Sequence, residues 1–464
     1  MIKKIPDYFP HPASYRDPSG FVFRSNGLYY RQVNRSYADN YEFLMSSGLY
    51  TALTKKGLLV THSEVSEDLT GHPDRYKILL PQQIAPISYP GEWSPCQLKD
   101  AALLTLQVLY ISLNHGMILK DATPLNVQFR EGKAVFIDTL SFEKYDATLP
   151  WVAYRQFCEC FLNPLFIHHY LQNGIHKIFA AYPEGIPAAM TARILPRKSR
   201  FRLGVWLHVL LPGKVRHDRA PGRMPAFSRQ KMLHLAANLE DNIRKLNVSE
   251  VSPSTWSTYY RETIISSAYL EAKERCFRDL ISDIDFSVAL DLGANDGYFS
   301  KILAEKEGQV IAVDAEWQCI NNLYQFTRQH TTMDILPLCV DIANPTPSQG
   351  FHHAERLSFT ERMPADLVVV LALIHHLALG RNIPLPQIAS YLSALTQECL
   401  ILEFVPLSDP KAAELIRNKT GPTITYDVDT LEQAFLPYFQ IEQQLPIPGT
   451  DRVLYRLKKN MEVL

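Results

Sequence analysis

The chain has 464 residues, of which 46% are hydrophobic and 20% charged, and its formal net charge is −1. This length predicts two globular domains of roughly 200 residues each, and the balanced charge argues against a dedicated nucleic-acid-binding protein, which usually has a basic excess. No run of about 18 apolar residues and no signal-peptide pattern is present, so the sequence predicts a cytoplasmic protein without a transmembrane segment.

The first half of the chain begins with a predicted β-hairpin. Short hydrophobic runs lie on both sides of Asn26-Gly27, a dipeptide that favours the two-residue turn between antiparallel strands. The later elements are a helix, two short strands, a long helix, a second hairpin and a largely helical stretch, expected over residues 37–56, 58–60, 76–80, 97–114, 127–137 and 151–246. This mixture predicts an α+β domain.

A basic segment, Arg193–Arg223, lies within the helical stretch. Lys and Arg residues flank an apolar run at Val205–Leu211. Such a segment is a candidate for peripheral contact with a membrane or for binding a phosphorylated substrate. The other interpretation is a solvated basic face beside a buried helix.

Three polar residues of the first half have a spacing that suits phosphoryl transfer. Asp121 is followed five residues later by Asn126, and Asp138 stands at the end of the second predicted hairpin. A carboxylate can accept the proton of an acceptor hydroxyl, and an amide and a second carboxylate can bind the magnesium ions that accompany nucleotide phosphates. If this domain is an active kinase that uses Mg-ATP, Asp121 is the candidate base and Asn126 and Asp138 are the candidate metal ligands.

This pattern resembles the catalytic loop and metal-binding aspartate of kinase-like folds, especially the aminoglycoside-phosphotransferase and lipopolysaccharide-kinase type. The chain departs from that family because no glycine-rich phosphate loop precedes the first hairpin. Arg31 stands where the ATP-binding lysine is expected, with Glu42 as a candidate partner, and His115 lies six residues before Asp121 instead of one or two. Three interpretations stay open: an active kinase for a sugar or small molecule, a degenerate module that binds nucleotide or substrate, and a coincidence in which Asp121 and Asp138 cap turns.

The second half changes to strands that alternate with helices. Seven strands are expected, at Phe286–Leu290, Gln309–Val313, Ile335–Val340, Leu367–Leu371, Cys399–Val405, Phe439–Leu445 and Val453–Leu457. Helical patterns separate most of them, and a Pro-Gly turn joins the last two. This alternation predicts a doubly wound, Rossmann-like α/β sheet.

A glycine turn follows the first of these strands. Asp291, Gly293 and Gly297 form a D-x-G-x-x-x-G pattern, and a helix is expected to begin at Tyr298. Glycine lets the backbone turn tightly and lets a ligand come close, and in an open α/β sheet such turns lie in the crevice at the carboxyl ends of the strands. The pattern is not the G-x-G-x-x-G of dinucleotide sites. The acid ahead of the first glycine suits a cationic ligand, such as the ammonium group of an amino acid.

Asp314 ends the second strand, roughly twenty residues further on, where a carboxylate can accept both hydroxyls of a ribose. With this acid, the pattern resembles the first two motifs of class I methyltransferases that use S-adenosylmethionine (SAM), and the resemblance covers about residues 276–464. It implies SAM as the cofactor, Asp314 at its ribose, Asp341 near its adenine, and four residues around its methionine part, namely Asp291, Gly293, Asn295 and Gly297. The alternative is an ordinary strand–turn–helix in an unrelated α/β domain.

Candidate catalytic residues follow the fourth and fifth strands. His375 and His376 lie where members of that family place residues that face the acceptor, and histidine can act as a general base near neutral pH. The other interpretation is that the pair only shapes the pocket, since methyl transfer from a sulfonium needs little beyond alignment. Glu403 is a candidate of the same kind. The absence of an Asn/Asp-Pro-Pro-Tyr motif argues further against a nucleic-acid acceptor.

The sequence therefore predicts a kinase-like domain over residues 1–235, a helical linker over 236–275 and a methyltransferase domain over 276–464. The expected activity is methyl transfer to oxygen or nitrogen of a small-molecule, glycan or lipid-linked acceptor, presented partly by the first domain. This architecture is similar to that of bacterial enzymes that modify or terminate surface polysaccharides, and of nodulation-related methyltransferase-like proteins of soil bacteria. The alternatives are a bifunctional kinase–methyltransferase that modifies a surface glycan and a non-enzymatic SAM-binding protein.

Overall fold

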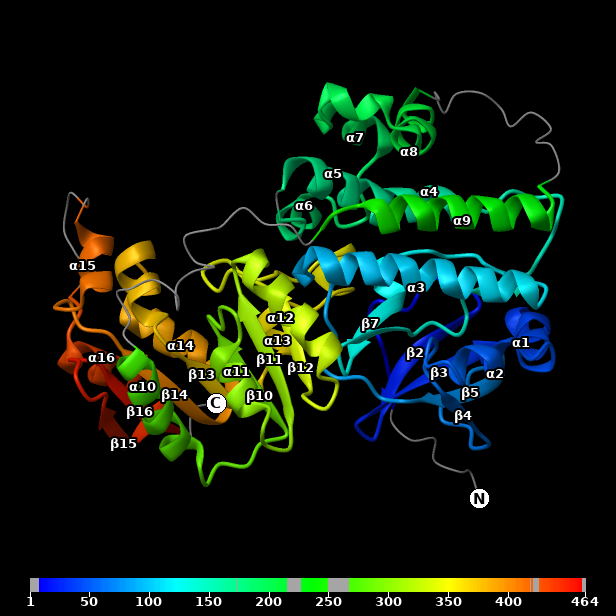
Figure 1. The fold of residues 1–464 in the computed structure, drawn as a ribbon. Helices are drawn as coiled ribbons and strands as arrows, with labels where there is room; N and C mark the ends of the chain where they lie inside the picture. The colour runs from blue at the N-terminus through cyan, green and yellow to red at the C-terminus, as the bar shows by residue number, and fades with distance from the viewer. Residues whose placement is uncertain are drawn as a thin grey trace, which may run out of the picture. The chain divides into compact units, whose positions relative to one another are not determined.

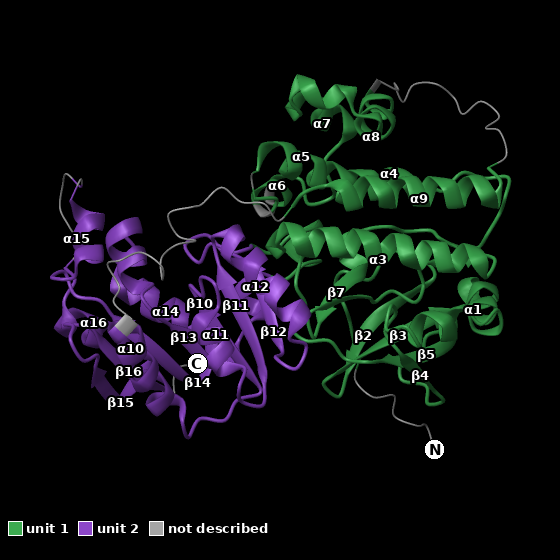
Figure 2. Cartoon of the chain, viewed as in Figure 1, with its two compact units in different colours: residues 1–250, 347–357 green, residues 251–346, 358–464 purple. Residues whose placement is uncertain are grey.

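The computed structural model describes residues 8–172, 174–214, 227–248, 267–417, 419 and 425–460. The chain divides into two compact units, which Figure 2 shows in different colours. Unit 1 comprises residues 1–250 and 347–357, and unit 2 comprises residues 251–346 and 358–464. The boundaries expected at residues 235 and 275 fall inside two helices, each of which belongs as a whole to one unit.

Unit 1 opens with an antiparallel five-stranded sheet in the order β1-β2-β3-β5-β4. Its strands are β1 (Phe9–Pro10), β2 (Gly20–Ser25), β3 (Leu28–Asn34), β4 (His62–Val65) and β5 (Arg75–Pro81). The first hairpin is confirmed, with φ values of 49° at Asn26 and 82° at Gly27. Both residues have the positive φ that this two-residue turn requires.

The helix expected over residues 37–56 is two helices in the structure. Helix α1 (Ala38–Ser46) ends shortly before Gly48, whose φ is 79°, and α2 (Leu49–Thr54) begins at the next residue. Glycine takes this left-handed conformation without the steric cost that a Cβ would bring. The prediction of one continuous helix is therefore wrong at this point.

The rest of unit 1 is mainly helical. The long helix α3 (Pro95–Asn114) packs along α9 (Arg229–Lys245), as Figure 1 shows. Two small sheets follow α3, in which β6 (Met117–Leu119) pairs with β9 (Phe142–Lys144) and β7 (Val127–Arg130) pairs with β8 (Lys133–Phe136). The α-helices between them and α9 are α4 (Tyr154–Phe157), α5 (Asn163–Leu171), α6 (His176–Ala181), α7 (Ala188–Ile194) and α8 (Leu203–Val205).

Short 3-10 and π-helical turns connect these elements of unit 1. They are η1 (Arg35–Tyr37), η2 (Pro90–Glu92), η3 (Pro124–Asn126), η4 (Cys158–Leu162), η5 (Arg197–Phe201), η6 (Trp206–Leu210) and η7 (Pro212–Lys214). Both η4 and η6 are π-helices. The turn η3 lies in the predicted phosphoryl-transfer motif.

Unit 2 is built on a seven-stranded sheet in the order β12-β11-β10-β13-β14-β16-β15. Its strands are β10 (Val288–Leu292), β11 (Gln309–Asp314), β12 (Ile335–Cys339), β13 (Ala365–Val370), β14 (Thr396–Phe404), β15 (Phe439–Pro446) and β16 (Val453–Lys459). The first five are parallel, and the final two form an antiparallel hairpin. The predicted seven-stranded α/β sheet is confirmed, with small shifts at the strand ends. The strand order reverses at β10, and such a switch point is where open α/β sheets bind ligands.

The helices of unit 2 are α10 (Ser267–Ile281), α11 (Tyr298–Leu303), α12 (Trp317–Gln329), α13 (Phe359–Arg362), η9 (His376–Gly380), α14 (Leu385–Leu395), α15 (Pro410–Ile416) and α16 (Val428–Phe435). Phe277 of α10 and Phe299 of α11 pack in one buried cluster with Ala289 and Val369 of the sheet. Among the described helices of the whole chain, none combines the length and apolar character needed to cross a membrane.

The connection between β12 and β13 includes a segment, residues 347–357, that belongs to unit 1. It contains the short turn η8 (Phe351–His353). Glu355 of this segment accepts hydrogen bonds from the Tyr15 hydroxyl (2.6 Å) and from Nη2 of Arg16 (2.7 Å). No local pattern indicated that this segment would join unit 1, because the pairing joins residues more than 300 positions apart.

Candidate functional site

The glycine turn of unit 2 forms where the sequence placed it. Strand β10 ends just before Gly293, and α11 begins directly after Gly297. The φ values of Gly293, Asn295 and Gly297 are 80°, 51° and 78°, so three residues of this turn have left-handed backbone. A Cβ on Gly297 would lie only 2.5 Å from Cδ1 of Leu323. The turn therefore requires glycine here, and it lies at the carboxyl edge of the sheet.

Asp291 lies two residues before this turn and is buried. Its Oδ2 accepts a hydrogen bond from Oγ of Ser300 at 2.6 Å. Burial raises the pKa of Asp291 to about 6, although the Ser300 hydroxyl and the charge of Lys273 act in the opposite direction. The carboxyl group thus ties the strand to α11 and titrates close to neutral pH.

Asp314 ends β11 and binds the backbone of the glycine turn. Its Oδ2 accepts the backbone N–H of Asn295, and its Oδ1 accepts that of Glu316, both at 2.8 Å. Burial raises the pKa of Asp314 to about 6. Within the described residues, no Lys, Arg or His side chain pairs with this carboxylate. Asp314 is therefore a half-buried acceptor with spare lone pairs and no counter-charge, beside the turn.

Asp341 lies two residues after β12, near Asp314 along the same edge. The backbone N–H of Val340 donates to the carbonyl oxygen of Asp314 at 3.0 Å. The Asp341 carboxylate accepts the backbone N–H of Ala343 at 3.0 Å and lies 3.2 Å from Nη2 of Arg381. Because the Asp341–Arg381 pair is partly exposed, it contributes at most about 1 kcal/mol to stability.

His375 and His376 follow β13 and differ in their surroundings. The His375 side chain is fully buried, and neither of its ring nitrogens has a hydrogen-bond partner among the described residues. Burial lowers the pKa of His375 well below its ordinary value, and it lowers that of His376 to about 4. A neutral imidazole has one donor and one acceptor nitrogen, and leaving a buried polar group unpaired costs about 1–3 kcal/mol. His375 is therefore the stronger candidate for contact with a ligand.

Glu403, near the end of β14, lies in a buried cluster of charges. The Lys273 ammonium is 2.6 Å from its Oε2, and Nη1 of Arg452 is 3.1 Å from its Oε1. The Tyr269 hydroxyl also donates to Oε1 at 3.0 Å. Burial opposes ionisation, but the charges of Lys273 and Arg452 outweigh it and lower the pKa of Glu403 to about 2. Glu403 is thus an anion with both oxygens engaged.

Sequence reasoning missed the two cations of this cluster. Lys273 was detectable, because it shares the buried side of α10 with Phe277 and Leu280, at helical spacing. A lysine in such an apolar stripe indicates a buried ion pair. Arg452 had no local signal. It lies in the turn before β16, and the antiparallel pairing of β14 with β16 brings it to Glu403.

The three residues of the predicted phosphoryl-transfer motif meet in unit 1. Nδ2 of Asn126 donates to Oγ of Ser141 at 3.0 Å, and the same hydroxyl donates to Oδ2 of Asp138 at 2.7 Å. Burial raises the pKa of Asp121, and the negative charge of Asp138 adds to this effect. Asp121 therefore shares this site, although its own carboxylate has no hydrogen bond or ion pair to another described residue.

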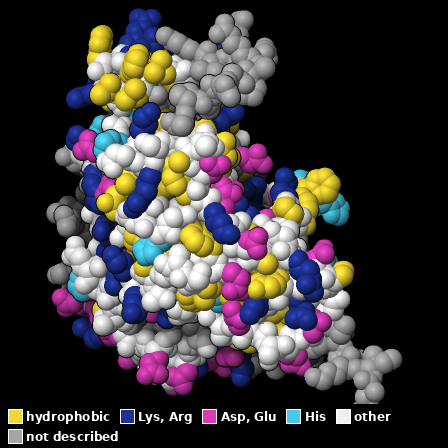
Figure 3. All heavy atoms as spheres, turned by 90° about the vertical axis from the view of Figure 1, so that its right-hand side faces the viewer, with side chains coloured by type: hydrophobic (Ala, Val, Ile, Leu, Met, Phe, Trp, Pro, Cys, Tyr) yellow, Lys and Arg dark blue, Asp and Glu magenta, His cyan; other side chains and the backbone are white. Residues whose placement is uncertain are grey.

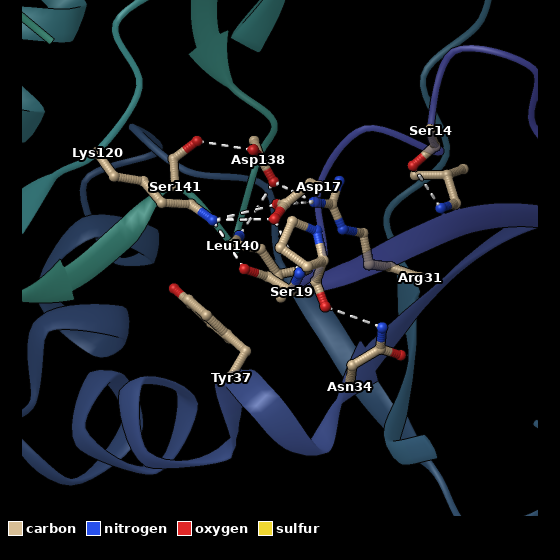
Figure 4. Close-up of polar contacts among 12 residues, drawn as sticks. Ser14, Asp17, Ser19, Arg31, Asn34, Tyr37, Lys120, Asp138, Leu140 and Ser141 are labelled. Carbon is tan, nitrogen blue, oxygen red and sulfur yellow. Dashed lines mark hydrogen bonds and ion pairs between the residues drawn. The ribbon is translucent and has the colours of Figure 1, made fainter. Parts of the chain in front are cut away.

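Two cations of this site are already neutralised, as the close-up of Figure 4 shows. Nη2 of Arg31 lies 2.9 Å from Oδ1 of Asp138, and Nζ of Lys120 lies 3.2 Å from each carboxylate oxygen of Asp17. Burial of Asp17 opposes its ionisation, but hydrogen bonds from Ser19 and Lys120 hold its pKa below the ordinary value. Sequence reasoning missed Asp17 and Lys120. Lys120 adjoins Asp121 in the chain, whereas Asp17 had no signal.

The expected pairing of Arg31 with Glu42 is wrong. Oε1 of Glu42 accepts a hydrogen bond from the Tyr76 hydroxyl at 2.6 Å, and Arg31 pairs with Asp138 and Asp17 instead. The reason is that Glu42 lies on the exposed side of the short helix α1.

The expected metal ligands of this site lie close together but do not form an open metal site. Both Asp138 oxygens are engaged, by Arg31 and by Ser141. In the part of the chain that the structure describes, no group of three or more His, Cys, Asp or Glu side chains is arranged to hold a metal ion.

Comparison with known proteins gives one full-length relative. The chain is 29% identical over 462 residues to nodulation protein NoeA of Rhizobium meliloti (strain 1021), an alignment that spans 97% of this chain and 96% of that protein. No family model matches. Solved structures with partial similarity include the N-methyltransferase NodS from Bradyrhizobium japonicum WM9, with 13% identity over 42% of this chain and 98% of that chain and a TM-score of 0.33. Another is the bifunctional kinase-methyltransferase WbdD, with 18% identity over 45% of this chain and 40% of that chain and a TM-score of 0.29.

Proposed function

We propose that unit 2 binds SAM at the glycine turn and transfers its methyl group to oxygen or nitrogen of a small-molecule, glycan or lipid-linked acceptor. The observation that carries this proposal is the half-buried Asp314 carboxylate, which has backbone partners but no cation partner among the described residues. It adjoins a left-handed turn at the switch point of the sheet. A ligand with ribose hydroxyls and a positive charge would supply the donors and the counter-charge that this edge lacks.

The residues present fit SAM in the following way. Asp314 would accept the ribose hydroxyls, and the backbone at Gly293 and Asn295 would lie against the methionine part. Asp291 would favour the ligand's positive charge, and Asp341 would lie near adenine. When bound, SAM supplies a methyl group on a sulfonium with an excellent leaving group, so the main task of the chain is alignment.

On the acceptor side, we assign the leading role to His375. Its imidazole is neutral and buried, and both of its nitrogens are unpaired among the described residues, so it can orient the acceptor through a hydrogen bond. His376 adjoins it, with ring centroids 4.2 Å apart. We propose that Glu403 positions Lys273 and Arg452 and is not a base, because a carboxylate whose pKa is about 2 holds a proton poorly at neutral pH.

Calorimetry with two matched aspartate variants tests the cofactor site. Asp314→Ala should weaken SAM binding at least about fivefold, because it removes charge-assisted hydrogen bonds worth at least about 1 kcal/mol. Asp366→Ala is the control, since Asp366 likewise accepts two backbone N–H bonds, from Ser287 and Val288 at 2.8 and 3.0 Å, but lies at the opposite edge of the sheet. It should leave SAM affinity unchanged. Equal affinity of Asp314→Ala and the unaltered protein would contradict the proposal.

Labelled SAM separates an enzyme from a protein that only binds it. The purified chain is incubated with labelled SAM and fractionated lysate, and the label is followed into glycan, lipid, small-molecule and protein fractions. We expect transfer that Asp291→Ala abolishes. SAM binding without transfer to any fraction would favour the non-enzymatic alternative.

For unit 1, we propose a degenerate kinase-like module that binds nucleotide or substrate but does not transfer a phosphoryl group. The supporting observation is that Asp17 and Asp138 already neutralise Lys120 and Arg31, and that both Asp138 oxygens are engaged. The alternative, a bifunctional kinase–methyltransferase, predicts a thermal shift with Mg-ATP and phosphoryl transfer that Asp121→Asn abolishes. The degenerate module predicts no phosphoryl transfer in either protein.

A further inference from the structure

Unit 1 has an apolar surface on the segment Arg197–Leu211, which comprises η5, α8 and η6 and ends one residue after η6. Four large apolar side chains in this segment are exposed, with exposed fractions of 92% for Phe201, 67% for Leu203, 45% for Trp206 and 40% for Leu211. Single exposed hydrophobic residues are ordinary, but a group within so short a segment marks an interaction surface.

The exposed side chains are carried by a segment that is fixed from behind. Val205 and Val209 are fully buried, and a Cβ on Gly204 would overlap the Asn242 side chain of α9, so α8 lies close against that helix. The ring nitrogens of His208 bond the Tyr154 hydroxyl at 2.7 Å and Oδ1 of Asn238 at 2.8 Å. A helix that is already anchored by one apolar side normally presents polar residues on the other. Here the outward side is apolar as well.

Exposed cations surround these apolar side chains. Four of them lie within six residues: Arg197, Lys198, Arg200 and Arg202. None of the four forms an ion pair with any residue that the structure describes. The sequence contains no Asp or Glu from Ile186 to Lys214, so the segment has no acid of its own. No described residue compensates this positive charge, so it is open to an anionic surface.

We propose that this basic–apolar patch, Phe201, Leu203, Trp206 and Leu211 with the four cations, docks on the surface of a lipid bilayer that carries anionic headgroups. Lys and Arg side chains are attracted to anionic headgroups, and apolar side chains enter the boundary with the acyl chains. Tryptophan is favoured at that interface. In the space-filling view, hydrophobic side chains gather beside Lys and Arg at the height of α7 and α8, at the top of the picture (Figure 3).

The aliphatic residues favour a bilayer over a nucleic acid. Leu203 and Leu211 gain from leaving water for an acyl layer, whereas single-stranded nucleic acids are bound by aromatic stacking and cations. Residues 215–223 of the basic segment, with Arg216, Arg219 and Arg223, lie outside the described residues. The proposal is independent of methyl transfer by unit 2.

Vesicle co-sedimentation of the full chain tests the proposal. Vesicles of phosphatidylcholine with added phosphatidylglycerol should bind the protein, with an affinity that falls as salt rises, and vesicles of phosphatidylcholine alone should bind it at least tenfold more weakly. Arg197→Gln with Arg200→Gln should lower the affinity more than tenfold, at about fivefold per cation. The control is Arg244→Gln with Lys245→Gln on α9, two exposed cations that are paired with Glu240 and Asp241. This control should bind as the unaltered protein does.

A second pair of variants tests insertion of the apolar side chains. Phe201→Ser with Leu203→Ser should weaken vesicle binding about tenfold or more and leave the far-ultraviolet circular dichroism unchanged, because both side chains are outside the core. Phe351→Ser is the control, since Phe351 is also exposed, at 72%, but lies on the segment 347–357. Trp206 fluorescence should shift to the blue on anionic vesicles, and Trp206→Phe should remove that shift.

Three outcomes would overturn the proposal. The first is equal binding to neutral and anionic vesicles, and the second is no binding to either. The third is binding of single-stranded RNA that the Arg197 and Arg200 variants abolish, without any vesicle binding, which would identify a nucleic-acid surface instead.

Discussion

The candidate sites of the two units use the same kinds of residue in opposite ways. In unit 2, Lys273 and Arg452 form ion pairs with the structural anion Glu403, and the side chains of these two cations are only 3% and 6% exposed. The motif acid Asp314 has no cation partner among the described residues. In unit 1, Arg31 and Lys120 are 17% and 21% exposed and are neutralised by Asp138 and Asp17. An acid at a strand end therefore indicates a ligand site only where the fold leaves that acid without a counter-charge.

Removal of Glu403 should produce the largest effect, since it breaks the buried charge cluster of unit 2. Glu403→Ala would leave Lys273 buried without an anion and Arg452 paired with Asp409 alone. We expect a loss of about 3–5 kcal/mol in the free energy of unfolding. Urea denaturation at neutral pH measures it. Glu442→Ala is the control, because Glu442 pairs with Arg456 at 3.0 Å on the surface, and it should cost about 1 kcal/mol or less.

Acid titration gives an independent check on the same cluster. The pKa of Glu403 is lowered from 4.5 to about 2, so its contribution to stability is fully present above pH 4.5 and is lost as the pH falls towards 2. The difference in stability between the unaltered protein and Glu403→Ala should shrink over this interval. A constant difference would mean that Glu403 is not held as a paired anion.

Local signals predicted much of the architecture. Hydrophobic runs located all seven strands of unit 2, and Asn26-Gly27 located the first hairpin. The spacing from Asp291 to Asp314 located the two acids that flank the glycine turn. These features depend on neighbouring residues, and short-range patterns record them well.

Long-range contacts were not predictable from the single sequence. Asp17 reaches Lys120 across about a hundred residues, and Arg452 reaches Glu403 through strand pairing. The segment 347–357 belongs to unit 1 although it lies between two strands of unit 2. In each case the partner is chosen by the fold, and the local residue pattern does not name it.

Substitution of His375 should have the second-largest effect. His375→Gln should lower methyl transfer about 100-fold, because the imidazole orients the acceptor, and leave SAM affinity nearly unchanged. His376→Gln should have a smaller effect, because it is the less buried of the two. His330→Gln is the control, since His330 is exposed and stacks on Phe326 of α12. The measurements are turnover of labelled SAM and calorimetry, and a fall in SAM affinity alone would place His375 in the cofactor pocket.

The smallest expected effect, about tenfold, is a pH dependence of SAM binding by unit 2. Burial raises the pKa values of Asp291 and Asp314 from 3.8 to about 6, so the folded protein holds protons that the unfolded chain releases between pH 4 and 6. These two groups therefore lower stability as the pH rises through that interval, whereas a cationic ligand that favours their ionised form should bind more tightly.

Calorimetry at pH 5 and pH 7 should show SAM affinity about tenfold weaker at pH 5 for each carboxylate that must ionise. Asp314→Asn should reduce the difference. In unit 1 the two carboxylates differ from each other. Hydrogen bonds and Lys120 keep the pKa of Asp17 below its ordinary value, whereas burial and the charge of Asp138 raise the pKa of Asp121. A pH-independent SAM affinity would show that neither Asp291 nor Asp314 must ionise to receive the ligand.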